Sequence, residues 1–212
     1  MKAAGILLGL VVIVYGELVI INWDDVPPTE LALEYESSIS MRPQINAADN
    51  AFVLLRQISE DDEAAMRREP SEPEQVASLA EDCRQAAATC LDLVIKRQYA
   101  AELWLELQEP VLAQYIKLLS YNDYLEPIPD SYIDIISYGG AGYGQKLLMM
   151  SAMISAVNGD QPHVIALLEA DLRFWRMLLA ESDLLITKMI ASAYIRNHFV
   201  QGNLVLRQLH EN

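Results

Sequence analysis

The sequence has few of the residues that build metal sites and nucleic-acid surfaces. Its 212 residues include only two Cys and three His, which leaves little material for a metal cluster. Basic residues are also scarce, because 15 Lys and Arg stand against 30 Asp and Glu and give a formal net charge of -15. Nucleic-acid binding needs a basic surface, so this balance argues against a nucleic-acid ligand. We therefore expect no cofactor, no bound metal and no nucleic acid.

Apolar residues, in contrast, are abundant. They make up 52% of the chain, which excludes disorder of the whole and supplies a core for one domain with an appendage. No segment of convincing length alternates between apolar and polar residues, whereas helical spacing recurs throughout. The fold class that we expect is all-α, divided into an anchor over residues 1–23, a linker with a short helix over 24–46 and a helical domain over 47–212.

Residues 3–21 form an apolar run with one charge, Glu17. As a helix this run is about 28 Å long, close to the hydrocarbon thickness of a bilayer. We expect a transmembrane anchor. The alternative is a cleaved signal peptide, cut near Gly16, although the apolar run continues past that point. Gly5 and Gly9 form a G-x-x-x-G pattern through which two such helices could dimerise, and Glu17 could contact a partner helix. Chance spacing and a carboxylate reaching headgroup water are the simpler alternatives.

The basic residues near this run indicate its orientation. Lys2 precedes it, and the first basic residue after it is Arg42. Because basic residues stay on the cytoplasmic side, the body is expected outside the cytoplasm. We expect a single-pass protein of the bacterial inner membrane with its C-terminal body in the periplasm, and a eukaryotic lumen would fit the same pattern.

The body is expected to be a set of helices broken at Pro and Gly residues. Thr29 is a candidate N-cap for a helix over 30–36, and a second helix is expected over 47–59. A mobile loop is expected over 60–74, then helix over 76–107 and a helix that begins at Pro110. Loops are expected over 122–129 and over the glycine-rich segment 139–144, which is too flexible for a helix interior.

The last third is expected to hold three helices. Residues 147–157 are apolar on nearly every side, which indicates a buried helix, and a turn follows at 158–160. The next helix is expected to bury Ile165, Leu168, Leu172, Trp175 and Leu179. The last helix is expected to begin after Ser182 or Asp183, and its core positions are expected to be Ile186, Ile190, Ala193, Val200 and Leu204.

This order of helix, Asn-Gly-Asp turn, helix and helix over residues 142–209 resembles the helical hairpins of the tetratricopeptide-like superfamily. The resemblance implies stacked hairpins, but no second copy follows at a 34-residue offset, so it does not imply a repeat array. The overall layout is also similar to uncharacterised membrane-anchored bacterial envelope proteins.

Cys83 and Cys90 are the two cysteines. On one continuous helix their α-carbons would lie about 10 Å apart, beyond the reach of a disulfide. An oxidising compartment nevertheless favours a bond, which would then require a bend between them. Both alternatives remain open. His163 and His210 are expected to face solvent, and His198 to face away from the expected core positions of the last helix.

Tyrosines gather around the Pro- and Gly-containing loops. We select Tyr124, Tyr132, Tyr138 and Tyr143 as candidate partner-binding residues, because tyrosine offers a large contact area with a polar tip. The alternative is that these rings fill the joint between helical subdomains. The paired carboxylates, such as Asp61 with Asp62 and Glu81 with Asp82, are expected to be solvated.

No nucleophile elbow, metal-ligand spacing or phosphate loop is present, so we expect no enzyme activity. The leading interpretation is a membrane-anchored periplasmic interaction protein whose acidic surface attracts a basic protein partner. It could be an immunity-type inhibitor of a toxin, or an accessory subunit of an envelope secretion or pilus complex. The alternative is an envelope hydrolase or a helical protein that binds a small ligand.

Overall fold

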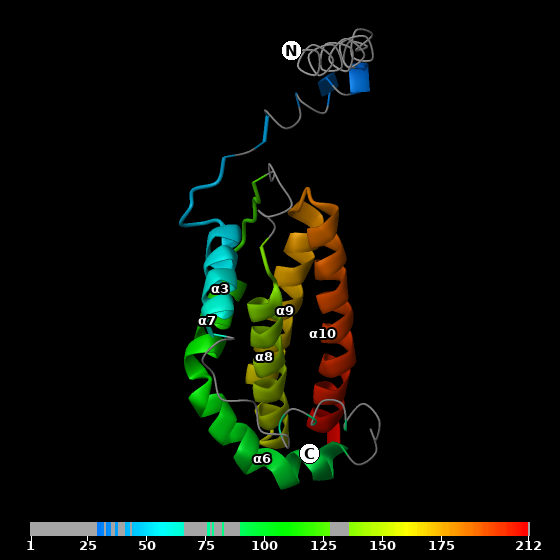
Figure 1. Ribbon diagram of the computed structural model, residues 1–212. Helices are drawn as coiled ribbons and strands as arrows, with labels where there is room; N and C mark the ends of the chain where they lie inside the picture. The colour runs from blue at the N-terminus through cyan, green and yellow to red at the C-terminus, as the bar shows by residue number, and fades with distance from the viewer. Residues whose placement is uncertain are drawn as a thin grey trace, which may run out of the picture. The chain divides into compact units, whose positions relative to one another are not determined.

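The computed structural model describes residues 44–65, 90–127 and 136–211, and also residues 29–31, 33, 34, 37, 41, 42, 76, 78 and 82. The chain divides into two compact units, Met1–Gln44 and Ile45–Asn212, and the second unit holds all the helices named below (Figure 1). Over the described residues the protein is all-α, with no strand beyond a single bridge between Asn50 and Asp123.

The expected anchor lies outside the described residues, together with Gly5, Gly9 and Glu17. None of the described helices is both long enough and apolar enough to cross a membrane. In the first unit, the described part of the expected helix over 30–36 is helical, and Leu33 N–H donates to the Thr29 carbonyl at 3.0 Å.

Helix α3 (Ala51–Ala65) begins and ends later than expected. Its start is fixed by Asn50, whose Oδ1 accepts hydrogen bonds from the N–H groups of Phe52 and Leu125, both at 3.0 Å. Residues 47–49 form a turn before it. The expectation of a loop from residue 60 is wrong as far as Ala65, because this acidic stretch has no Gly or Pro before Pro70 to end the helix.

Helices α6 (Cys90–Leu107) and α7 (Glu109–Leu119) follow the expected helical region and the expected start at Pro110. Pro110 lies in the first turn of α7, where its missing N–H leaves no intrahelical bond unmade. Asp82 is also helical, and its carboxylate accepts a hydrogen bond from the Arg97 guanidinium of α6 at 2.7 Å.

The expectation of a flexible glycine loop is wrong, because the whole segment is the first part of helix α8 (Gly139–Val157). The glycines serve close packing here. A Cβ at Gly144 would lie only 2.5 Å from the Tyr115 ring, so only glycine lets α7 and α8 approach this closely. Helix α8 contacts α3, α6, α7, α9 and α10, which confirms the prediction of a buried helix that is apolar on nearly every side (Figure 1).

A turn with Gly159 at φ 75° joins α8 to helix α9 (Gln161–Glu181). Asp160 caps α9 by accepting a hydrogen bond from His163 N–H at 3.2 Å. The expected core positions of α9 are correct in part: Leu168 and Trp175 are buried, whereas Ile165 is exposed. The residues that α9 buries are Val164, Leu167, Leu168, Asp171, Phe174, Trp175 and Leu178.

Helix α10 (Leu185–Glu211) packs against α8 and α9 with a different side from the one expected. Of the expected core positions, Ile186, Ala193 and Val200 are exposed, whereas Ile190 and Leu204 are half-buried and pack against the core. The buried positions are Thr187, Ala191, His198, Gly202, Val205 and Gln208. The buried side of α10 therefore mixes apolar and polar residues, and two of the polar ones, Thr187 and His198, contact buried carboxylates.

Candidate functional site

The first of these carboxylates belongs to Glu126, which is 2% exposed. Its Oε2 accepts hydrogen bonds from the Tyr124 hydroxyl and the Thr187 hydroxyl, both at 2.8 Å. Its Oε1 accepts bonds from the Ser182 hydroxyl and from Leu184 N–H, the latter at 2.9 Å. A buried carboxylate is tolerated only when such donors replace water. We call Glu126 with these donors and Tyr138 the Glu126 cluster.

Tyr138 completes this cluster, since its hydroxyl lies 3.0 Å from the Thr187 hydroxyl and 3.2 Å from that of Tyr124. Both tyrosines are buried, at 2% and 6% exposed, so neither ring is available to a partner in this conformation. This favours the alternative that tyrosines fill a joint between helices. Tyr143 is half-buried on α8, and Tyr132 lies outside the described residues.

The second buried carboxylate belongs to Asp171 of α9, which is fully buried. Its Oδ1 accepts a hydrogen bond from the Tyr115 hydroxyl at 2.5 Å. Its Oδ2 accepts one from the Gln145 amide at 2.9 Å and lies 2.7 Å from His198 Nδ1. The indole N–H of Trp175 in turn donates to the Tyr115 hydroxyl at 3.0 Å. This Asp171 cluster ties α7, α8, α9 and α10 together.

The expectation for His198 is therefore wrong. Its side chain is buried in the core, whereas three of the five apolar residues chosen as core positions are exposed. Because an ionised carboxylate can only accept, the contact with Asp171 places the proton on Nδ1. His163, by contrast, is exposed at the start of α9, and His210 is exposed near the end of α10.

Burial shifts the acidity of the tyrosines in both clusters. It raises the pKa of Tyr115 well above the ordinary value, and the neighbouring Asp171 charge raises it further. Burial likewise raises the pKa of Tyr124, with added contributions from Tyr138 and Glu126. It also raises the pKa of Tyr138, although the hydrogen bonds of its hydroxyl offset part of this shift. The three phenols are therefore held as neutral hydrogen-bonding groups.

The two clusters have the geometry of structural networks. The carboxylate oxygens of Glu126 and Asp171 are all engaged by donors of the chain itself. The His198–Asp171 pair resembles the base and orienting acid of a catalytic triad, which also needs a nucleophile at Nε2. Among the residues that the structure describes, no hydroxyl or thiol bonds that nitrogen. What the clusters do is hold α7, α8, α9 and α10, together with the loop that carries Tyr124 and Glu126, in one arrangement.

Other sequence-derived candidates are placed as follows. Cys90 is the first residue of α6, and Cys83 lies outside the described residues, so their bonding stays a prediction. Asp82, one of the paired carboxylates, accepts a hydrogen bond from the Arg97 guanidinium at 2.7 Å. This hydrogen bond holds the pKa of Asp82 below its ordinary value. No group of three His, Cys, Asp or Glu residues that could hold a metal ion occurs in the described part of the chain.

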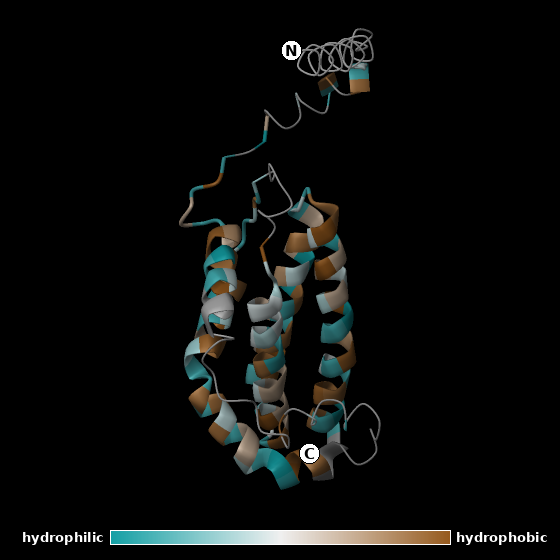
Figure 2. Ribbon diagram, in the orientation of Figure 1, coloured by the Kyte–Doolittle hydropathy of each residue, from teal (hydrophilic) through white to brown (hydrophobic). Residues whose placement is uncertain are grey.

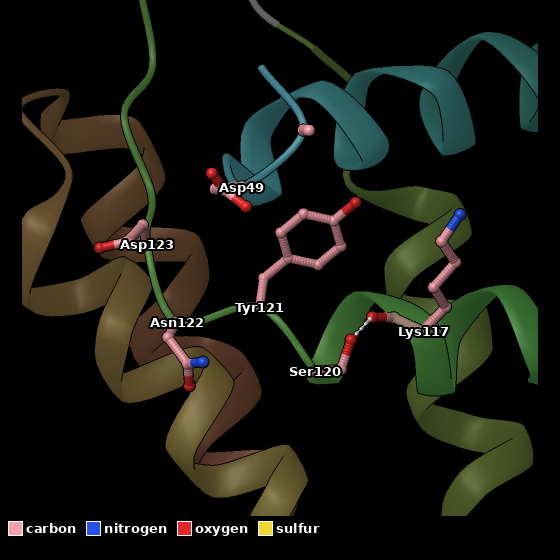
Figure 3. A pocket seen from close by; sticks show the side chains of 7 residues that line it. Asp49, Lys117, Ser120, Tyr121, Asn122 and Asp123 are labelled. Carbon is pink, nitrogen blue, oxygen red and sulfur yellow. Dashed lines mark hydrogen bonds between the residues drawn. The ribbon is translucent and has the colours of Figure 1, made fainter. Parts of the chain in front are cut away.

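A shallow polar hollow lies where the turn before α3 meets the end of α7 (Figure 3). Tyr121 stands at its centre, between Asp49 and Lys117, and Asn122 and Asp123 line its edge. It is small and open, and its polar groups come from the end of α7 and from the turns beside it. This geometry does not enclose a ligand in the way that small-molecule sites usually do.

Two rows of exposed apolar side chains, on α6 and α10, are the more informative surface features. Figure 2 shows apolar residues interspersed with polar ones along both of these helices. The α6 row consists of Ile95, Tyr99, Leu103 and Leu107, between 52% and 79% exposed. The outer face of α10 consists of Leu185, Ile186, Met189, Phe199, Val200 and Leu206, between 40% and 73% exposed. Large apolar side chains gathered on one exposed surface often mark interaction sites.

Among the residues of the two clusters and the two exposed rows, the sequence pointed only to Tyr124 and Tyr138 as candidate site residues. One signal was available for Asp171: it lies three or four positions from Leu167, Leu168, Phe174 and Trp175, and so on the apolar side of its helix. A charged residue at such a position must find a buried partner. The exposed α10 face had no such signal, because its apolar spacing is that of a core helix.

Comparison of the chain with protein-family models, with curated proteins and with solved structures finds no match. Its function is therefore argued from geometry and chemistry alone.

Proposed function

We propose that this chain is a membrane-anchored protein that binds another protein through its helical body and catalyses no reaction. The apolar run over residues 3–21 would hold it in the bacterial inner membrane, with the body in the periplasm. The observation that carries the proposal is the α6 row, which places four large apolar side chains in contact with solvent at spacings of four residues.

The charges around this row support a basic partner. Glu102, Glu106 and Glu109 lie between or directly after the later residues of the row, whereas Lys96 and Arg97 follow Ile95, and Arg97 is bonded to Asp82. Residues 161–212 contain five basic and five acidic residues, so the whole formal net charge of -15 belongs to residues 1–160, which include α6. An acidic surface of this kind attracts a basic protein from a distance, and the apolar row then supplies the dry contact.

The inner side of α6 already attaches this helix to the fold, so its outer side is available for contact with a partner. Val94, Ala101 and Trp104 are buried, and they already attach the helix to α8. The outer residues therefore add little to the stability of the fold. Tyr99, at 79% exposed, is the aromatic residue on this surface and is of the type that dominates binding energy in protein interfaces.

Both specific roles considered from the sequence are compatible with this surface. An immunity-type protein would use it to neutralise a basic toxin, and an accessory subunit would use it to join an envelope complex. The proposal commits to the partner's chemistry, which is that of a basic protein with an apolar contact surface.

A photo-crosslinking residue placed at Tyr99, in cells that express the full chain, tests the proposal. We expect a discrete adduct with a basic protein, and no such adduct from the same residue at Ala166, which is exposed on α9. Replacing Tyr99 and Leu103 by Ser should remove the partner while leaving the free energy of unfolding nearly unchanged. The same adducts from both positions, or none from Tyr99, would contradict the proposal.

The membrane arrangement has a separate test. Fusions of alkaline phosphatase and of a cytoplasmically fluorescent protein to the C-terminus should give phosphatase activity without fluorescence. Fluorescence without phosphatase activity would place the body in the cytoplasm and overturn this part of the proposal.

A further inference from the structure

We propose that the outer face of α10 binds a second copy of this chain, with the two α10 helices side by side and antiparallel. This surface differs from the α6 row in its elements and in its charge. Its apolar residues fall into two groups, Leu185 to Met189 near the start of the helix and Phe199 to Leu206 toward its end.

The pattern is complementary to itself when one helix is reversed. With the two-fold axis midway between positions 193 and 196, Met189 of one copy lies opposite Val200 of the other. Ala193 then lies opposite Arg196, and this small side chain leaves room for the long one. Leu185 likewise lies opposite Leu204 and Phe199 opposite Ile190, which is the self-match that a symmetric two-fold interface requires, whereas Ile186 falls opposite Asn203 and Leu206 opposite Asp183.

Charge supports the same register. Arg207 falls opposite positions 182 and 183 of the second copy, next to the exposed acidic residues Glu181 and Asp183. The two-fold axis repeats this attraction at the other end of the helix pair. Two aligned parallel helices would instead bring Arg207 against Arg207, which repel each other.

The location of the net charge also favours this face. Two copies of a chain with a formal net charge of -15 repel each other over most of their surface. The α9–α10 hairpin lies within residues 161–212, where five basic residues balance five acidic ones, so two copies can approach there without that penalty. The α6 row, within the acidic residues 1–160, would bring like charges together.

Crosslinking of the full-length chain in membranes tests this register. In a background with Cys83→Ser and Cys90→Ser, one chain carries Met189→Cys and another carries Val200→Cys. A short bis-thiol crosslinker should join the two chains when they are expressed together. Each chain alone should give little product, because its two thiols would be offset by 11 residues, or about 16 Å along the pair.

A second measurement follows the affinity. Sedimentation equilibrium of the full-length chain in density-matched detergent should show a dimer, with at least about tenfold weaker association after Met189→Ser with Val200→Ser. Tyr99→Ser with Leu103→Ser is the matched control and should leave the association unchanged. It should still abolish binding of the basic partner, so the two proposals can fail separately.

Three outcomes would overturn the antiparallel pair. One is strong crosslinking of each cysteine variant with itself, which indicates parallel helices. Another is the absence of crosslinks, with an adduct between α10 and a different protein or with lipid, which assigns the face to that occupant. The third is an association constant that the serine substitutions on α10 leave unchanged.

Discussion

The side of α10 that packs against α8 and α9 holds polar residues beside apolar ones, and several large apolar residues lie on the side turned away. The side packed against α8 and α9 buries Thr187 and His198, whereas the side turned away exposes Leu185, Met189 and Phe199. In an ordinary amphipathic helix the apolar residues face the core and the polar residues face water. Here the hydrogen-bond demand of the core contributes to the choice of the buried side, beside apolar packing.

The polar residues on the buried side of α10 are explained by the two carboxylates that they contact, Glu126 and Asp171. An unpaired buried carboxylate is far more costly than the exposure of a few apolar side chains, each of which forfeits only part of its transfer free energy. Thr187 and His198 meet this demand directly. The apolar residues are left on the outside, where they are available for contacts with another chain.

The largest expected effect comes from removing the buried acceptor of the Asp171 cluster. Asp171→Ala leaves Tyr115, Gln145 and His198 without their common partner, and it should lower the free energy of unfolding by about 3–5 kcal/mol. Denaturant unfolding measures this. Glu169→Ala, at an exposed position of the same helix, is the control and should change stability by less than about 0.5 kcal/mol. Equal effects of the two substitutions would show that the cluster is not needed for the fold.

The next effect concerns close packing rather than hydrogen bonds. Gly144→Ala forces its new methyl group against the Tyr115 ring and should cost about 1–3 kcal/mol. Gly202→Ala, on α10, finds its nearest neighbour at an ordinary 3.6 Å and should be neutral or gain up to about 1 kcal/mol from helix propensity. Thermal or denaturant unfolding of the two variants measures both effects. A tolerated Gly144→Ala would contradict the close approach of α7 and α8.

A smaller effect is expected at Tyr138, together with a change in pH dependence. Tyr138→Phe removes hydroxyl contacts in the Glu126 cluster and should cost about 1 kcal/mol at neutral pH.

The pH dependence follows from the raised pKa values of Tyr115, Tyr124 and Tyr138. Above the ordinary tyrosine value of 10.0, the unfolded chain releases phenolic protons that the folded chain retains. The free energy of unfolding should therefore be unaffected by these groups below that pH and fall as pH rises beyond it. Tyr138→Phe should make this fall less steep. An unchanged slope would indicate that Tyr138 ionises freely in the folded chain.

The sequence was sufficient to predict the helical class, the start of α7 at Pro110, the turn at Gly159 and the buried character of α8. These features follow from local signals: proline and glycine placement, and an apolar run without a polar side. The glycine-rich start of α8 was not predictable from local propensity, since its glycines are explained by Tyr115, a residue of another helix.

The polar clusters were not predictable for a related reason. Glu126 lies in a loop and Asp171 on a helix, and their donors come from segments between 2 and 61 residues away in the chain. Apolar spacing predicts that Ile186 and Val200 lie in the core. It carries no information about hydrogen bonds between α10 and the neighbouring segments.

Neighbouring substitutions on α10 test the central claim most directly, measured as unfolding free energies at a protein concentration where the chain is monomeric. Thr187→Val makes a buried position more apolar, and Ile186→Thr makes an exposed position more polar. Thr187→Val should destabilise the protein by at least about 1 kcal/mol, because Glu126 loses a donor, and Ile186→Thr should change stability by less than about 0.5 kcal/mol. The reverse result, with Ile186→Thr the more damaging, would show that α10 buries its apolar side after all.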